Sequence, residues 1–187
     1  MLLSILICTI EKRKEMFLSL IKNFAEQSLL LSGDKKNSFE VCVCDAEDIS
    51  IGEKRNELIA LAKGKFVVFV DDDDLVSDDY VSNILTCIEQ NPDIDCIGIQ
   101  GKITTDGGNE RQWFISIDCR GWYEQDGIYY RTPSHISPIR RDIAQMVKFK
   151  EINHGEDSDF SECIFPLLKK EAKINSDMYF YRYKSIK

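Results

Sequence analysis

Four consecutive aspartates, Asp71–Asp74, directly follow an almost entirely apolar run, Lys65–Val70. The run is rich in Val and Phe, which predicts a buried strand with the carboxylates at its carboxyl end. Ligands bind at this edge of an open α/β sheet because the loops leaving the strands enclose a crevice. Adjacent carboxylates repel one another, and a hard divalent cation relieves that repulsion. The aspartates therefore predict a metal site, with a solvated acidic loop as the alternative.

A second acidic segment, Gly155–Asp159, stands immediately before an amphipathic run. Acids near a helix N-terminus are stabilised by the helix dipole, so ordinary capping explains this segment without any chemistry. Together with the aspartate run, this segment also suggests two sets of carboxylates with separate roles. One set of carboxylates would hold a metal and its anionic ligand, and the other would accept a proton.

Two other kinds of aspartate site are alternatives for the run that begins at Asp71. An EF-hand loop starting there would place Val76 where glycine must turn the chain and Ser82 where the bidentate glutamate belongs, which excludes it. A phosphatase with an aspartate nucleophile also carries its acids after a strand and binds magnesium there. That alternative stays open, although the strand is the third in order here rather than the first.

The chain up to the aspartates alternates between strand-like and helix-like patterns. The pattern predicts strands over 2–8, 39–44 and 65–70, and helices over 11–31 and 51–62. This alternation predicts parallel strands with right-handed crossovers. Thr9, Asp45 and Asp71 then lie together at three neighbouring strand ends.

The later part of the chain has a mixed, partly antiparallel character. Strands are predicted over 95–100, 112–117, 128–131 and 174–183, and helices over 77–91, 139–147 and 157–170, the last bent at Pro166. The fold class is therefore α/β, with a mainly parallel central sheet flanked by helices and an antiparallel C-terminal part.

Composition limits the class of protein. The length of 187 residues predicts one domain, and a net charge of −8 argues against a nucleic-acid or anionic-membrane binder. The seven cysteines include no CxxC pair, so neither a disulfide framework nor a zinc site is indicated. The N-terminal apolar run lacks the features of a signal peptide, and no run is long enough for a membrane span. We expect a cytoplasmic protein without a transmembrane segment.

The ordered motifs resemble family 2 glycosyltransferases of the GT-A fold. The resemblance is carried by Ser4–Thr9, the strand ending at Asp45, Gly52–Asn56 with Ala62–Phe66, Val70–Asp74, and Gly155–Asp157. It covers the N-terminal half closely and the C-terminal half mainly at the Glu-Asp pair. It implies a single GT-A domain, 1–187, with a nucleotide-binding half, 1–75, and a half for the acceptor and catalytic base, 76–187.

The resemblance assigns the donor-binding residues position by position. Thr9 would line the nucleotide pocket, and Asp45 would hydrogen-bond the base. Arg55 would approach the nucleotide, while Asp71 and Asp72 would hold the ribose side of the site.

The resemblance also assigns the residues of the reaction. Asp73, within the family's DXD motif, would bind Mn²⁺ or Mg²⁺, which would bridge the diphosphate, and Asp157 would be the catalytic base. His135 is a candidate further ligand or acceptor contact, with a structural role as the alternative. Trp113 and Trp122 fall where an acceptor would dock, and packing in the core or in a lid is an equal alternative for both.

The implied activity is metal-dependent, inverting transfer of a sugar from a nucleotide diphosphate donor to a hydroxyl group of a glycan or other acceptor. The transition state would be oxocarbenium-like. A noncatalytic module that binds a nucleotide sugar or a metal is the alternative. The sugar, base and acceptor are not identified, because specificity rests on a few pocket contacts.

Overall fold

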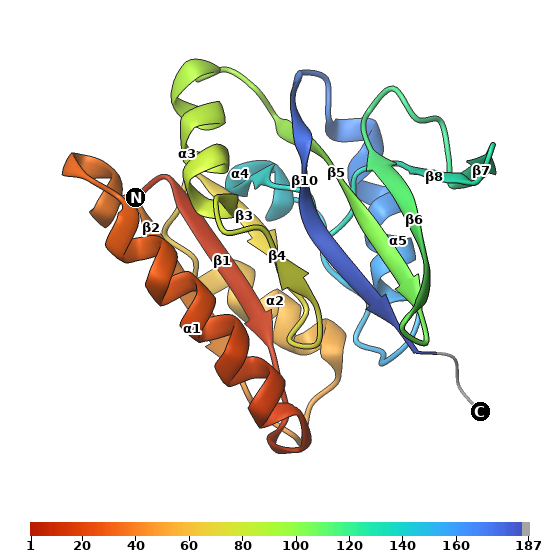
Figure 1. Cartoon of the computed structure of the whole chain (residues 1–187), viewed down its shortest axis with the longest axis horizontal. Coiled ribbons are helices and arrows are strands. Elements are labelled where there is room, and N and C mark those ends of the chain that lie inside the picture. Colours follow the sequence, from red (N-terminus) through yellow and green to blue (C-terminus); the bar gives the residue numbers. More distant parts are fainter. Residues whose placement is uncertain (185–187) are drawn as a thin grey trace.

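The computed structural model describes residues 1–184, and in them the strands join into one sheet (Figure 1). The strand order is β2-β1-β3-β9-β5-β6-β8-β7, and β10 pairs with both β5 and β4. The strands are β1 (Leu3–Cys8), β2 (Phe39–Cys44), β3 (Phe66–Phe69), β4 (Leu75–Val76), β5 (Cys96–Thr105), β6 (Gly108–Ile115), β7 (Tyr123–Gln125), β8 (Ile128–Arg131), β9 (Ile139–Arg140) and β10 (Glu171–Tyr183).

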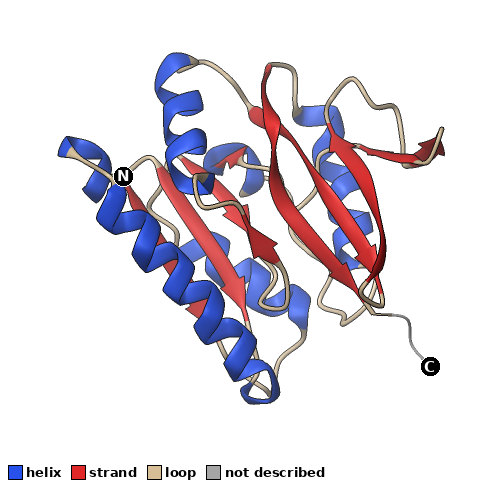
Figure 2. Ribbon diagram, in the orientation of Figure 1, coloured by secondary structure: helices blue, strands red, loops and turns tan. Residues whose placement is uncertain are grey.

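Helices cover both faces of the sheet (Figure 2). They are α1 (Lys14–Leu30), α2 (Ile51–Leu61), α3 (Tyr80–Gln90), α4 (Arg141–Ala144) and α5 (Glu156–Ile164). Apolar side chains of α1 and α3 belong to one buried cluster, and those of α2, α4 and α5 belong to another. The predicted α/β fold with helices on both faces is confirmed.

The parallel part of the sheet holds the strands predicted from the first half of the chain. β1 is parallel to β2 and to β3, with Leu3 opposite both Phe39 and Phe66. β1 is largely buried and β3 wholly so, as expected for central strands covered on both faces. The carboxyl ends of β1 and β3 therefore lie side by side, and they place Thr9 and Asp71 at the same edge of the sheet.

A capping box fixes the start of α2. The Ser50 hydroxyl accepts a hydrogen bond from the Glu53 backbone N–H at 3.2 Å, and the Glu53 carboxylate accepts one from the Ser50 N–H at 2.8 Å. Such reciprocal bonds satisfy donors that the first turn leaves free. The capped helix holds Lys54 and Arg55 on its buried side, facing the carboxyl ends of the strands.

The helix predicted over 139–147 is mostly wrong. Ile139 and Arg140 form the short strand β9, and only Arg141–Ala144 is α-helical. Ile139 lies opposite both Val67 of β3 and Cys96 of β5, so β9 joins the parallel and mixed parts of the sheet. Apolar residues spaced four apart are typical of a helix. Here residues 139–140 are extended because they pair with the edges of β3 and β5.

The helix predicted over 157–170 is shorter than expected. α5 ends at Ile164, and a 3-10 turn follows over Phe165–Leu167. Pro166 has no N–H with which to continue the helical ladder. Beyond the turn, the backbone N–H groups of Lys169 and Lys170 donate to the Asp95 carboxylate, and the chain enters β10.

Gly101 lets β5 and β10 pair closely. A Cβ at this position would lie 1.8 Å from the Tyr179 carbonyl oxygen and 2.8 Å from the Trp113 ring. We expect Gly101→Ala to lower the free energy of unfolding by at least about 1–3 kcal/mol, as overpacking does. Urea denaturation measures the change. Gly121→Ala is the control, because a Cβ there would meet nothing within 4 Å, and equal stability of the two variants would contradict the close approach.

All seven cysteines are free, and only Cys163 among them is exposed. No helix in the described part of the chain combines the length and hydropathy needed to cross a bilayer.

Candidate active site

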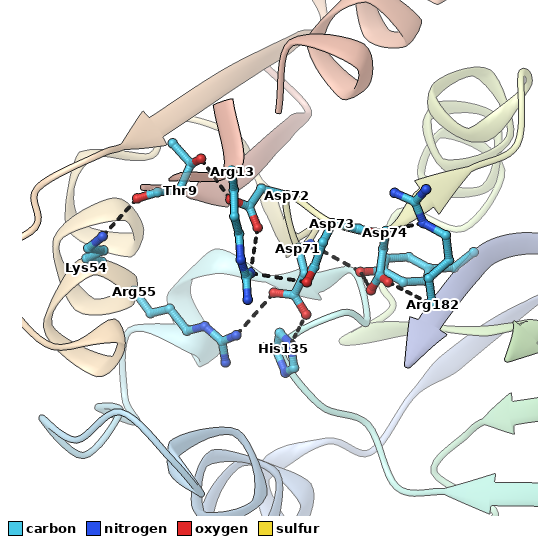
Figure 3. A network of polar contacts seen from close by, with 11 residues as sticks. Thr9, Arg13, Lys54, Arg55, Asp71, Asp72, Asp73, Asp74, His135 and Arg182 are labelled. Atoms are coloured by element: carbon cyan, nitrogen blue, oxygen red, sulfur yellow. Dashed lines mark hydrogen bonds and ion pairs between the residues drawn. The ribbon is translucent and has the colours of Figure 1, made fainter. Parts of the chain in front are cut away.

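The acidic run forms a tight turn at the end of β3. The Asp74 N–H donates to the Asp71 carbonyl at 3.1 Å, and this turn sends the four carboxylates in different directions. Figure 3 shows Arg13, Arg55 and His135 pointing toward them from three separate segments. The four acids therefore have different surroundings and different chemical capacities.

Asp72 is enclosed by neighbouring side chains. It is buried, and its two carboxylate oxygens accept hydrogen bonds from the Thr9 hydroxyl and from Arg13 Nη1, each at 2.8 Å. The Lys54 ammonium donates to the Thr9 carbonyl at 2.9 Å. Asp72 thus ties the end of β1 to the acidic turn and fixes Thr9 beside it.

Asp71 lies between an arginine and a histidine side chain. Arg55 Nη2 is 3.2 Å from one carboxylate oxygen, and His135 Nε2 is 3.4 Å from the other. Burial alone raises the pKa of Asp71, but the charges of His135, Arg55 and Arg13 outweigh it and hold the pKa below its ordinary value. Asp71 is therefore ionised at neutral pH.

Asp74 is buried against the last strand. It accepts hydrogen bonds from the Tyr179 hydroxyl at 2.8 Å and from the Arg182 backbone N–H at 2.9 Å. Burial and the nearby Asp71 charge raise the pKa of Asp74 to about 8. Tyr179 also accepts from the Asp71 N–H at 3.1 Å, so β10 shapes the turn.

Asp73 is the acid that best fits a divalent cation. Its side chain is 32% exposed, and Arg13 Nη1 approaches it at 3.3 Å. Burial and repulsion by Asp71 and Asp72 together raise its pKa, so its charge is only partly compensated. In the described residues, no three acidic, histidine or cysteine side chains gather as a complete metal shell. In proteins, Mg²⁺ is often held by one or two carboxylates together with substrate phosphates.

A buried ion pair connects the acidic turn to the helix that carries Asp157. Arg55 Nη1 lies 3.1 Å from Glu156 Oε1, and both side chains are almost wholly buried. The Arg55 guanidinium also lies over the Phe69 and Phe149 rings, at 5.5 and 5.4 Å from their centroids. Arg55 therefore bridges the acidic turn and the first turn of α5.

Removing the Glu156 charge should destabilise the protein. We expect Glu156→Gln to lower the free energy of unfolding by about 1–3 kcal/mol, because the buried Arg55 loses one of its two carboxylate partners. Urea denaturation is the measurement. Glu162→Gln, on the exposed side of the same helix, is the control and should change little. A loss no larger than that of the control would contradict the bridging role.

Asp157 and the acidic turn line one cavity of about 50 Å³. Asp71 and Asp74 contribute from the turn, and Asp157 contributes from the first turn of α5. Aromatic and cationic side chains complete the wall: Trp113, Trp122, Arg131, His135, Tyr179 and Tyr181. The structure thus brings the two predicted acidic segments to the same space.

A larger cavity of about 260 Å³ lies on the other face of the mixed sheet. Phe114 and Tyr130 line it, and they alternate along their strands with Trp113 and Arg131, which face the acidic cavity. Its acid Asp118 is exposed and pairs with Lys173. We place the chemistry at the smaller cavity because the compensated acids and the cations converge there.

The remaining predicted residues lie along the nucleotide side. Thr9 is buried beside Asp72, whereas Asp45 is exposed just past the end of β2. The Thr9 N–H donates to the Cys44 carbonyl at 2.9 Å, which keeps the two strand ends adjacent. Neither Thr9 nor Asp45 lines the cavity that holds Asp157.

Several partners of the acids had no clear signal in the sequence. Arg13 belongs to the basic cluster Lys12–Lys14, and nothing in the sequence links it to Asp72. Tyr179 and Arg182 lie in a strand more than 100 residues after the acids that they bind. His135 was a candidate, and the structure places it against Asp71, with its buried Nδ1 unpaired among the described residues.

A family model described as glycosyl transferase family 2 matches residues 37–154, which is more than half of the chain. The chain belongs to glycosyl transferase family 2. The match includes the acidic turn and His135, and it ends shortly before Asp157. No curated protein sequence matches the chain.

Solved structures of TarS from S. aureus share the fold of this family 2 chain. TarS 1–349 in complex with UDP-GlcNAc is 19% identical with a TM-score of 0.75, covering 100% of this chain and 60% of that one. TarS 1–349 in complex with UDP is 19% identical with a TM-score of 0.73, covering 97% and 60%. The chain thus spans less than two thirds of these relatives, and the predicted GT-A fold is confirmed.

Proposed function

We propose that this chain transfers a sugar from a nucleotide diphosphate donor to a hydroxyl acceptor, with inversion and with Mn²⁺ or Mg²⁺. The observation that carries the proposal is the shared cavity, in which Asp157 faces the acidic turn. Membership of glycosyl transferase family 2 supports the reaction class. Asp157 would act across the cavity from the diphosphate held at the turn.

The donor would lie along the carboxyl ends of β2, β1 and β3. Asp45 would bind the base, Thr9 would line the pocket, and Asp71 and Asp72 would hold the ribose side with Arg55 nearby. Arg13, already 3.3 Å from Asp73, adds a positive charge where the diphosphate would lie. A metal ion held by Asp73 would supply positive charge that stabilises the leaving diphosphate.

Asp157 would act as the general base. Its carboxylate would take the proton of the acceptor hydroxyl. The oxygen of that hydroxyl would then attack the anomeric carbon of the donor sugar from the face opposite the diphosphate. The bond between that carbon and the diphosphate oxygen breaks as the new bond forms, so the configuration inverts. Asp157 Oδ1 accepts from the Ser158 N–H at 2.8 Å, and this bond orients the carboxylate.

The direct test is donor hydrolysis, because transferases also pass sugar to water. The purified protein is incubated with a panel of nucleotide diphosphate sugars and Mn²⁺, and release of the nucleoside diphosphate is measured. The panel begins with UDP-GlcNAc, which is bound in a TarS structure. We expect release that stops in Asp157→Asn. Binding without turnover would indicate a noncatalytic module, and Asp71-dependent hydrolysis of a phosphomonoester would indicate a phosphatase.

A further inference from the structure

Arg131 is a cation of the active-site cavity that has no carboxylate partner in the described part of the chain. It extends from the end of β8 into the space lined by Asp157, and it is only partly exposed. No described side chain forms a hydrogen bond or ion pair with its guanidinium. By contrast, Arg111 on the neighbouring strand β6 pairs with Glu124 and Tyr129. A partly buried cation that lines a cavity and has no carboxylate partner indicates a site for an anion.

The guanidinium N–H groups of Arg131 have no hydrogen-bond acceptor among the residues that the structure describes. Its guanidinium carbon lies over the Trp122 ring, 4.9 Å from the ring centroid. Trp122 is itself anchored, because its Nε1 donates to the Thr132 hydroxyl at 3.1 Å. The planar guanidinium carries its N–H groups in a fixed fork, the arrangement that binds phosphate or carboxylate through two hydrogen bonds.

A second unpaired donor lines the same cavity. The Trp113 side chain is 4% exposed, and its indole N–H has no partner among the described residues. A buried donor without an acceptor is unfavourable, so such groups usually have a ligand or water in the functional state. Arg131 and Trp113 thus bring a positive charge and an unpaired donor to the wall of one cavity.

We propose that the acceptor carries an anionic group, a phosphate or a carboxylate, which Arg131 and the Trp113 N–H bind while Asp157 takes the hydroxyl proton. The inference rests on the proposed function. We assign the anion to the acceptor because Arg13 and Arg55 already serve the nucleotide side, at the ends of β1 and β3. Arg131 lies instead close enough to Asp157 for their charges to interact.

The binding test compares glycerol 3-phosphate with glycerol, with tryptophan fluorescence as the readout. Wild type should bind the phosphate ester at least about tenfold more tightly than glycerol. Arg131→Gln should abolish the difference, and Trp113→Phe should weaken it. Arg111→Gln is the matched control and should retain it. Equal preference for the phosphate in wild type and Arg131→Gln would overturn the proposal.

Donor hydrolysis without acceptor tests whether Arg131 binds the anionic group of the acceptor or the diphosphate of the donor. We expect the KM for donor of Arg131→Gln to match wild type, since Arg131 would not touch the donor diphosphate. A raised KM in this variant would assign Arg131 to the donor and overturn the proposal. If wild type hydrolyses no donor, the proposed function fails while the binding test still decides the anion site.

Thermal denaturation distinguishes a binding role from a structural one. Because Arg131 has no ion pair within residues 1–184, Arg131→Gln should be no less stable than Arg111→Gln, which loses the contacts with Glu124 and Tyr129. A larger loss of stability in Arg131→Gln would show that the side chain serves the fold, and it would contradict the proposal.

Discussion

Asp157→Asn should lower the rate of sugar transfer by about 10²–10⁴-fold, the usual contribution of a general base. Asparagine keeps the size of the side chain and an oxygen that can accept from the Ser158 N–H, but it cannot take a proton. The donor should bind as in wild type, because the predicted nucleotide contacts lie at the ends of β1, β2 and β3. Nucleoside diphosphate release and the donor Kd measure the two quantities separately.

Asp159→Asn is the matched control for the catalytic base. Asp159 belongs to the first turn of the same helix, α5, but it pairs with Lys150 and does not line the cavity. Its replacement should leave turnover near the wild-type rate. Comparable loss of activity in both variants would indicate a general effect on α5, and undiminished turnover in Asp157→Asn would remove the base from the mechanism.

Asp73→Asn should abolish the metal-dependent part of nucleotide binding. For wild type, a nucleoside diphosphate with Mn²⁺ at 100 times its Kd should stabilise the fold by about 2.7 kcal/mol. In the variant, adding Mn²⁺ should give no more stabilisation than the nucleotide alone. Thermal shift with nucleotide alone, Mn²⁺ alone and both together measures the difference.

The ligand-free protein provides a check on the same variant. Burial and the acids Asp71 and Asp72 raise the pKa of Asp73, so the ionised side chain is unfavourable in the fold at neutral pH. Asp73→Asn should therefore fold at least as stably as wild type. Asp78→Asn removes an exposed acid just beyond the turn and should keep the full metal response. Retained metal-dependent binding in Asp73→Asn would exclude Asp73 as the ligand.

The nucleotide-side fold was predictable because its signals are local. The apolar runs that became β1 and β3 needed no partner to be recognised. The convergence of Thr9, Asp45 and Asp71 followed from parallel pairing alone. In contrast, β9 exists only because β3 and β5 leave room between them, so residues 139–140 carried no sign of it.

The acidic run was only partly interpretable from sequence. Mutual repulsion among the four carboxylates predicted a cation site at the run. The structure shows that Asp72 is bonded to Thr9 and Arg13, and Asp74 to Tyr179 and Arg182. These partners come from distant parts of the chain, and no local pattern joins them. The position of Asp157 across the cavity likewise depends on the buried pair of Arg55 and Glu156.

The site is tested most directly by anomalous X-ray diffraction from crystals grown with Mn²⁺ and the nucleoside diphosphate that gives the largest thermal shift. We predict one manganese peak within bonding distance of an Asp73 carboxylate oxygen and of diphosphate oxygens, at the acidic turn whose Asp71 and Asp74 share a cavity with Asp157. A nucleotide bound away from the acidic turn, or a diphosphate held there with no manganese at Asp73, would contradict the proposed active site.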